Sequence, residues 1–279
     1  VTGVQTCALP IYQISPKSFI ENVHGSGYNG VELFLQPPDH LTNDFMAAID
    51  QVRNSDPDFY LISMQIIFPE VETVDNYISK MEKKLSGIAG LNPIFINSHT
   101  GKDHFSFDDN CRVIEASLNF SQKNGIRILH ETHRGRFSFH AATLLKYLEK
   151  FPELELVGDF SHFCTVSESM LQDQDEIINK IIPHVGHIHA RVGFEQGPQV
   201  NDPAAPEWHT HLEQFMLWWE KIVAHHKAKG TNFLTFTPEF GPVPYMPLEP
   251  FTLKPMSNVW DNNIFMLHKL QERFSAAVV

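Results

Sequence analysis

Four residues of metal-binding types each close a short apolar run: Glu131, Asp159, His189 and Glu239. They are separated by steps of 28, 30 and 50 residues. One strand and one helix together take about 30 residues, so the first two steps each fit one βα unit and the third fits a unit with a longer loop. The carboxyl ends of parallel strands meet at one mouth of a (β/α)8 barrel. The spacing therefore predicts that the four side chains converge there.

Three carboxylates and one imidazole make an oxygen-rich ligand set. Such a set suits one divalent metal ion, Mn²⁺, Co²⁺ or Mg²⁺, with Zn²⁺ also possible, and it leaves positions for two substrate oxygens. For any one of these residues alone, an acid that pairs with Arg or Lys at a strand end is an equally good interpretation. Four such residues in phase favour the metal site.

Two other residues of ligand type are interpreted as structural. His187 and His189 lie two apart on one predicted strand, so their side chains point to the same side. We predict His189 as the ligand because it is nearer the carboxyl end of the strand, and His187 as a hydrogen-bonded interior histidine. Glu32 ends no predicted strand, and we therefore interpret it as structural too.

Strands that alternate with helices are expected to position these residues. Strands are predicted at 30–35, 59–67, 93–97, 128–131, 156–159, 185–189 (or to 191) and 233–239. Helices are predicted at 15–27, 41–53, 73–85, 106–124, 144–151, 177–182, 208–222 and 263–274. Alternation of this kind implies a parallel sheet, and the number of units implies a closed one.

Residues 1–11 do not continue this pattern. They carry no charge and follow no clear period, and they resemble a translated cloning segment. We expect the first strand of the barrel to be truncated or replaced by this non-native N-terminal segment, with Cys7 to Tyr12 in its place. The predicted fold is an α/β (β/α)8 TIM barrel. Such barrels usually take about 250 residues, which fits residues 12–279 as a single domain.

Composition limits the classes of partner. The formal net charge is −12, which argues against nucleic acid because phosphate binding requires a basic surface. No apolar run approaches the 18 or so residues that span a bilayer, so no membrane partner is expected. The three cysteines lack metal-ligand spacing, which indicates a reduced, cytoplasmic protein.

From Leu129 to Gly241 the motifs resemble the xylose isomerase-like TIM barrel superfamily, in its sugar phosphate isomerase/epimerase branch. That branch includes ketohexose 3-epimerases, hydroxypyruvate isomerase and inosose dehydratase. The order of elements resembles that of the family from Ser15 to the C-terminus. The matching motifs are a Glu that ends strand five, an Asp followed three residues later by His, the second His of a His-x-His, and a Glu before a turn on strand eight: Glu131, Asp159 with His162, His189, and Glu239.

The resemblance implies a divalent-metal-dependent sugar isomerase or epimerase. In the family the Asp and the His hold the ion, whereas both Glu residues ligate it and also transfer the substrate proton. The reaction proceeds through a metal-bound enediolate, because the ion acidifies the C–H bond next to a carbonyl and two carboxylates can act as acid and base. Here these would be Glu131 and Glu239, with His162 touching a small sugar or sugar-like substrate. By analogy with the family, a homo-oligomer is possible.

The chain departs from the epimerase pattern near the predicted mouth. The epimerases place an Arg six residues beyond the strand-seven histidine, where this chain has Glu195. Either Arg191 serves instead or the substrate differs. His133, His99 and Lys102 are further candidate substrate contacts, and surface decoration is the alternative interpretation of the last two.

Three other readings stay open. A metal-dependent lyase or dehydratase acting on a keto-sugar, an inosose or a 3-keto-glycoside would use the same machinery and then expel a leaving group. An AP endonuclease-like protein would need a metal cluster and a basic face, and the charge of −12 weighs against it. A non-catalytic sugar-binding protein would not need to retain all four ligand types.

Overall fold

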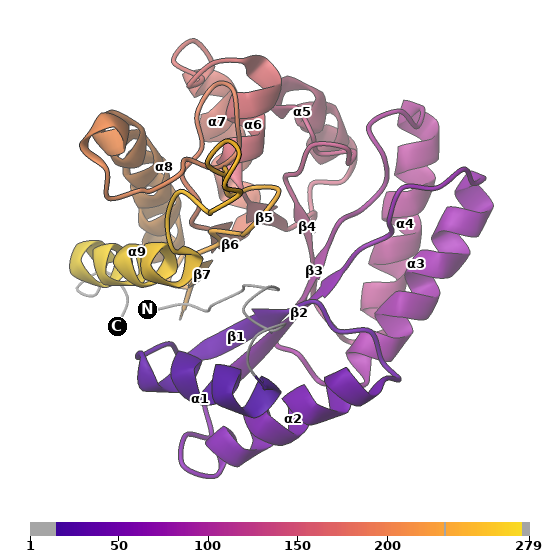
Figure 1. Cartoon of the computed structure of the whole chain (residues 1–279). Coiled ribbons are helices and arrows are strands. Elements are labelled where there is room, and N and C mark those ends of the chain that lie inside the picture. Colours follow the sequence, from indigo (N-terminus) through magenta and orange to yellow (C-terminus); the bar gives the residue numbers. More distant parts are fainter. Residues whose placement is uncertain (1–14, 232, 275–279) are drawn as a thin grey trace.

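The computed structural model describes residues 15–231 and 233–274 (Figure 1). The segment 1–11 and the expected replacement strand from Cys7 to Tyr12 lie outside the described residues. Predictions about them, and about where the single domain begins, therefore stay predictions.

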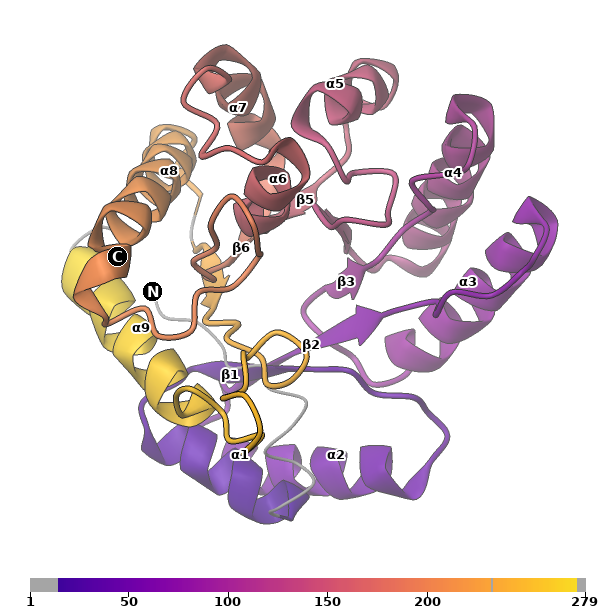
Figure 2. The ribbon, with the colours of Figure 1, turned by 45° about the horizontal axis from the view of Figure 1, so that its top comes forward.

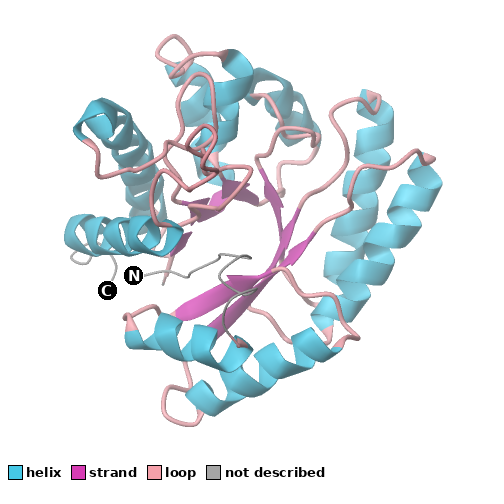
Figure 3. Cartoon of the chain, in the orientation of Figure 1, coloured by secondary structure: helices cyan, strands magenta, loops and turns pink. Residues whose placement is uncertain are grey.

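Seven parallel strands form one sheet in the order of the sequence. Their bounds are β1 Gly30–Leu33, β2 Tyr60–Gln65, β3 Ile96–Ser98, β4 Ile128–Glu131, β5 Leu156–Gly158, β6 Val185–His189 and β7 Thr235–Thr237. Figure 3 shows these strands around the centre, with the helices outside. Within the described part of the chain, β1 and β7 are the two edges of the sheet. The result is a nearly closed barrel, which confirms the predicted TIM barrel with a truncated or replaced first strand.

Helices follow the strands in alternation. Their bounds are α1 Pro16–Gly25, α2 His40–Arg53, α3 Val74–Ala89, α4 Phe107–Asn124, α5 Ala141–Lys150, α6 Phe160–Ser167, α7 Asp175–Ile181, α8 His209–Ala228 and α9 Val259–Phe274. Short 3-10 turns lie at Ile182–His184 and Pro206–Trp208. Within the described residues, no helix has the length and apolar character needed to cross a membrane.

Local sequence explains several helix ends. The Ser106 hydroxyl accepts a hydrogen bond from the Asp109 backbone N–H at 3.1 Å and begins α4. Gly125 ends the same helix at φ +65°, a left-handed conformation that favours glycine. Of the helices that the structure describes, α6 is the one that the sequence pattern did not predict. It begins directly after β5 because the Asp159 carboxylate caps it.

Side chains along each strand alternate between the helices and the barrel interior. In β4, Ile128 packs in a cluster with residues of α3 and α4, whereas Leu129 packs in a separate cluster with Ile62, Phe95 and Val157, which lie on the strands or directly before one. His130 donates to or accepts from the Thr100 hydroxyl at 2.7 Å, and Glu131 follows Leu129 into the interior. The barrel therefore has an apolar inner layer, with a polar layer nearer the carboxyl ends of the strands.

Side chains connect the two edges of the sheet. The Thr237 hydroxyl on β7 donates to Glu32 Oε2 on β1 at 2.6 Å. Farther out, the Tyr28 hydroxyl donates to the Asn263 carbonyl on α9 at 3.2 Å, and Leu267 of α9 packs in the core cluster of α1 and α2. Side-chain contacts therefore hold β1 and β7 together where the described residues show no backbone ladder.

The loops after β6 and β7 lie over the carboxyl end of the barrel (Figure 2). Gln199 in the first loop exchanges two hydrogen bonds with Gly241 in the second, at 2.8 and 2.7 Å. These bonds fix the two loops to each other beside the polar layer.

Candidate active site and metal centre

The four predicted ligand residues converge. Each offers one oxygen or nitrogen atom, and these atoms all lie within 4.8 Å of one another. Glu131 is the last residue of β4, Asp159 follows β5, His189 is the last residue of β6, and Glu239 lies two residues beyond β7. Three of them are buried and the Glu239 side chain is 18% exposed. The parallel strands thus bring together side chains that are far apart in sequence.

Asp159 is held by its role as a helix cap. Its Oδ1 accepts hydrogen bonds from the Ser161 backbone N–H at 3.0 Å and from the Ser161 hydroxyl at 2.5 Å. Its Oδ2 accepts from the Arg191 guanidinium. Burial raises the pKa of Asp159 to about 6, although Arg191 opposes this shift. One carboxylate oxygen is therefore committed to α6, and the other faces the cluster.

His189 lies between carboxylates on both sides of its ring. Its Nε2 is 3.1 Å from both oxygens of Glu32, so it donates its N–H there. Its Nδ1 is 2.8 Å from Glu239 Oε2 and 3.8 Å from Glu131 Oε2. Burial opposes charging of the ring, but Glu239, Glu32 and Glu131 together raise the pKa of His189 well above its usual value. The geometry leaves Nδ1 facing the cluster.

Glu32 has a larger role than its sequence position suggested. Its carboxylate is fully buried and also accepts hydrogen bonds from Asn97 Nδ2 at 2.9 Å and from the Thr237 hydroxyl at 2.6 Å. Burial would raise the pKa of Glu32, but His189 and His187 hold it well below its usual value. The sequence did contain one sign of this role, a single acid in the apolar run 30–35. A charge in a buried strand needs a partner.

These residues fit a bound cation. Among the described side chains, Arg191 is the one permanently charged cation in contact with Glu131, Asp159, Glu239 or Glu32. Three buried polar atoms that could bind an ion remain without hydrogen bonds: Glu131 Oε1, His189 Nδ1 and Glu239 Oε2. The last two lie 2.8 Å apart without hydrogen-bond alignment, close to the ~3 Å expected between neighbouring octahedral ligands with bonds of about 2.1 Å. A divalent ion would satisfy both the charge and these acceptors.

Three predicted substrate contacts line one side of the cluster. The His133 ring lies between the rings of His99 and His162, with centroid distances of 4.6 and 3.9 Å. Arg191 Nη2 donates to His162 Nε2 at 3.0 Å, so the His162 proton is on Nδ1, which is buried and has no partner. Burial lowers the pKa of His162 well below its usual value, with His133 adding to the shift. His162 therefore presents a neutral N–H donor.

The other two predicted contacts are held by neighbouring side chains. Lys102 Nζ contacts Glu72 Oε1 at 3.0 Å and the Glu70 carbonyl at 3.2 Å, so its ammonium group is engaged away from the four ligands. Arg191 is fully buried between Asp159 and His162 and lies 4.6 Å from the ring centroid of Tyr245. Tyr245, which the sequence pattern did not single out, thus packs against the site.

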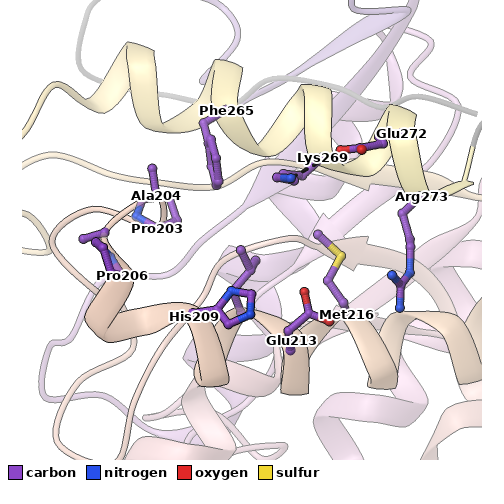
Figure 4. Close-up of a pocket in the computed structure, with 12 residues that line it drawn as sticks. Pro203, Ala204, Pro206, His209, Glu213, Met216, Phe265, Lys269, Glu272 and Arg273 are labelled. Carbon is purple, nitrogen blue, oxygen red and sulfur yellow. Dashed lines mark hydrogen bonds and ion pairs between the residues drawn. The ribbon is translucent and has the colours of Figure 1, made fainter.

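A large cavity of about 750 Å³ lies elsewhere, between α8 and α9. Figure 4 shows its lining side chains, which include His209, Met216, Phe265 and Arg273. The four converging residues do not line it, and its mixture of apolar and ion-paired side chains offers no comparable ligand set. The predicted ion-binding residues therefore lie at the barrel mouth and not in this cavity.

No protein-family model and no curated protein matches the sequence. The structure is nevertheless similar to solved structures along nearly its whole length. The probable 3-DHS dehydratase AsbF of Bacillus anthracis gives a TM-score of 0.60 at 18% identity, over 96% of this chain and 98% of that one. A xylose isomerase domain protein of Alicyclobacillus acidocaldarius gives 0.58 at 12% identity, over 99% of both chains.

A xylose isomerase-like TIM barrel protein of Mycobacterium smegmatis, solved in complex with magnesium, gives a TM-score of 0.59 at 11% identity, over 97% of both chains. At such low identity these similarities concern the fold. The chain therefore has the xylose isomerase-like TIM barrel fold that its motifs resemble.

Proposed function

We propose that this protein is a divalent-metal-dependent enzyme that acts on a keto-sugar or related polyol ketone by moving a proton next to the carbonyl. The observation that carries the proposal is the convergence of Glu131 and Glu239 with Asp159 and His189 within 4.8 Å. Mn²⁺, Co²⁺ and Mg²⁺ suit this donor set, and Zn²⁺ is a further candidate. The cytoplasmic location and a homo-oligomeric state stay predictions.

A divalent ion held by these four residues would polarise adjacent carbonyl and hydroxyl oxygens of the substrate and acidify the C–H bond between them. Glu131 is ionised, as a base must be before it accepts a proton: burial opposes its ionisation, but His99 and His189 hold its pKa well below the usual value. Glu239 is more exposed and lies beyond its strand at the mouth. One carboxylate removes the proton, and the other returns a proton to the opposite face of the carbon.

The neighbouring side chains orient the substrate. His162 Nδ1 is a buried donor without a protein partner and can donate to a substrate hydroxyl. Arg191 and Tyr245 form a cation–π pair beside it. Which of Glu131 and Glu239 acts first follows from the hand of the substrate.

A lyase or dehydratase is the second candidate. It begins with the same proton removal, after which a hydroxyl or aglycone on the next carbon leaves with its bonding electrons and takes up a proton. The fold neighbour named a probable dehydratase supports this reading. In this second candidate the partnerless His162 N–H would donate a hydrogen bond to the leaving group.

The experiment that tests the proposal is proton exchange in D₂O. Ion-free protein is loaded with Mn²⁺, Co²⁺ or Mg²⁺ and incubated with ketoses, inososes and 3-keto-glycosides, and products are followed by NMR. We expect deuterium on the carbon next to the carbonyl, lost in Glu131→Gln and Glu239→Gln but retained in the control Glu149→Gln, whose side chain is exposed on α5. Isomer formation indicates the isomerase, and loss of water or aglycone indicates the lyase. Exchange that persists at the wild-type rate in both variants contradicts the proposal.

A further inference from the structure

Another cavity, of about 640 Å³, lies between α3 and the segments that follow β1 and β2. Its wall combines apolar side chains, two aromatic rings and three lysines of α3: Phe34, Phe68, Lys80, Lys83 and Lys84. None of the four converging ligand residues lines it. We propose that this cavity binds a small organic anion with a flat apolar body, of the aromatic carboxylate class, and that it is separate from the active site.

The lysines leave unpaired positive charge at the cavity. Lys80 is neutralised, because its Nζ contacts Glu70 and lies 3.1 Å from Glu72 Oε2. Within the part of the chain that the structure describes, Lys83 and Lys84 have no acidic partner. The three lysines are spaced i, i+3 and i+4 on one helix and therefore share a face. In a chain with a formal net charge of −12, two unpaired cations beside one cavity favour an anionic ligand.

The apolar part of the cavity suits a ring. The rings of Phe34 and Phe68 meet edge to face with their centroids 5.8 Å apart. Phe68 is 59% exposed, so part of its ring is open to a further aromatic contact, which prefers the same edge-to-face or offset geometry. Lys84 Nζ lies 5.9 Å from the centroid of the Phe34 ring. The cation thus stands beside apolar surface, as a ligand with both a ring and a charge requires.

The wall of the cavity is held in place by the protein itself. The Arg136 guanidinium donates to the Ile67 carbonyl at 3.1 Å, and Lys102 Nζ donates to the Glu70 carbonyl at 3.2 Å. These two bonds fix the segment after β2 to the loops after β4 and β3. Three prolines in the lining restrict the backbone further. A cavity formed in advance costs less ordering when a ligand binds, and ligand sites are usually of this kind and size.

Gln65 adds a donor without a partner to the lining of the cavity. Its side chain is fully buried, and its Oε1 accepts a hydrogen bond from the Ser98 hydroxyl at 2.7 Å. Its Nε2 has no hydrogen-bond partner, and a carboxylate oxygen that reached it would accept from it. The Gln65 backbone carbonyl accepts the His99 N–H at 2.9 Å, so the cavity lies beside the active site without including its ligands.

The alternative is that the lysines form an ordinary solvated helix face above a water-filled gap between loops. A pair of ligands separates the two interpretations: 2-naphthoate carries a ring and a negative charge, and 2-naphthamide has the same ring without the charge. An anion site prefers the first. A merely apolar gap binds both equally, and a solvated gap binds neither.

The test is calorimetric titration of the full chain with each of the two compounds. We expect 2-naphthoate to bind at one saturable site and 2-naphthamide to bind at least about 10-fold more weakly, because hydrogen bonds to an ionised group are the stronger ones. The double variant Lys83→Gln/Lys84→Gln should weaken 2-naphthoate by about 10-fold and leave 2-naphthamide unchanged. Lys146→Gln, an exposed lysine of α5, is the matched control and should bind both compounds as the wild type does.

The outcomes also separate this cavity from the barrel mouth. Arg134 is an exposed cation there, 5.7 Å from the ring centroid of Tyr245. Loss of 2-naphthoate binding in Arg134→Gln but not in the double lysine variant places the anion at the mouth and overturns the proposal. Equal affinity for the two compounds, an equal loss in Lys146→Gln, or no saturable binding overturns it too. None of these results bears on the proposed function, because the four ligand residues are unchanged throughout.

Discussion

Replacing Glu32 with Gln should weaken ion binding although Glu32 is not itself one of the four converging ligands. The Glu32 carboxylate accepts the His189 Nε2–H at 3.1 Å and so directs Nδ1 at the cluster. Gln keeps the size of the side chain but loses the charge, and its NH₂ group must face a donor from His189, Asn97 or Thr237. The substitution therefore disturbs the orientation of His189 and the electron density on its ring.

The expected loss of ion affinity in Glu32→Gln can be estimated in two ways. Residues that hold a ligating histidine typically contribute about 10- to 100-fold in metal affinity, which is about 1.4 to 2.7 kcal/mol. A hydrogen bond to a charged group contributes about 1.5 to 3 kcal/mol, and the carboxylate oxygens lie at 3.1 Å from the ring nitrogen. The two ranges agree.

The assay is Co²⁺ titration of ion-free protein in competition with a coloured chelator. Thr237→Val is the matched control, because it removes the 2.6 Å hydrogen bond to Glu32 but leaves the carboxylate against His189. We expect the dissociation constant to rise 10- to 100-fold in Glu32→Gln, and less than about 3-fold in the control. Thermal unfolding of the ion-free variants checks that both fold. Wild-type affinity in a folded Glu32→Gln, or an equal loss in Thr237→Val, would refute the reasoning.

Three further predictions concern the proton, the histidine and the loop lysine. Glu239→Gln, assayed at an ion concentration that saturates the variant, should lower kcat by about 10²- to 10⁴-fold because one proton-transferring carboxylate is lost. Near-normal turnover of the ion-loaded variant would contradict this. Burial lowers the pKa of His189, but its carboxylate neighbours outweigh burial and raise this pKa well above its usual value. Ion binding near pH 7 should therefore release about one proton from the ring, and the release should vanish as the pH rises through the raised pKa. Calorimetry in two buffers measures the number of protons released, and no release at pH 7 would argue against a protonated ring. Lys102→Met should lower the free energy of unfolding by about 2 kcal/mol, because Glu72 loses a charged partner. Urea unfolding measures this change. An unchanged free energy of unfolding together with a raised KM would instead favour a substrate contact for Lys102.

The residues at the strand ends were predictable because the sequence pattern that marks them is local. An apolar run that ends in a ligand type is visible in the sequence, and parallel strands place their carboxyl ends at one mouth whatever their partners are. The step from Glu131 to Asp159 contains α5 and then β5, and the step from Asp159 to His189 contains α6, α7, a 3-10 turn and then β6. The interior role of His187 was predictable for the same reason, and the structure confirms it: the ring is buried between the Thr235 and Thr237 hydroxyls at 2.6 and 3.0 Å.

Residues whose roles depend on distant strands were not predictable. Glu32 gains its role from His189 on β6 and Thr237 on β7, which lie 157 and 205 residues away. The helix α6 was missed because Asp159 both ends a strand segment and caps the helix. His99 and Lys102 lie in one loop, yet their side chains contact Glu131 and Glu72 respectively. A loop has no period from which such directions could be read.

Barrel closure and the site share the same side chains. Between β1 and β7 the described residues show no backbone ladder, and the Thr237 hydroxyl bridges this gap to Glu32. The same carboxylate holds His189, so a movement of β1 relative to β7 would rotate a ligand of the site. An ion bound to His189 and Glu239 would in turn stabilise β6 and the segment after β7 beside this seam, because anything that binds only the folded state favours it. Ion binding and the contact between β1 and β7 should therefore be coupled through Glu32. For this reason Glu32, although it ends no strand, is expected to influence both ion affinity and closure of the barrel.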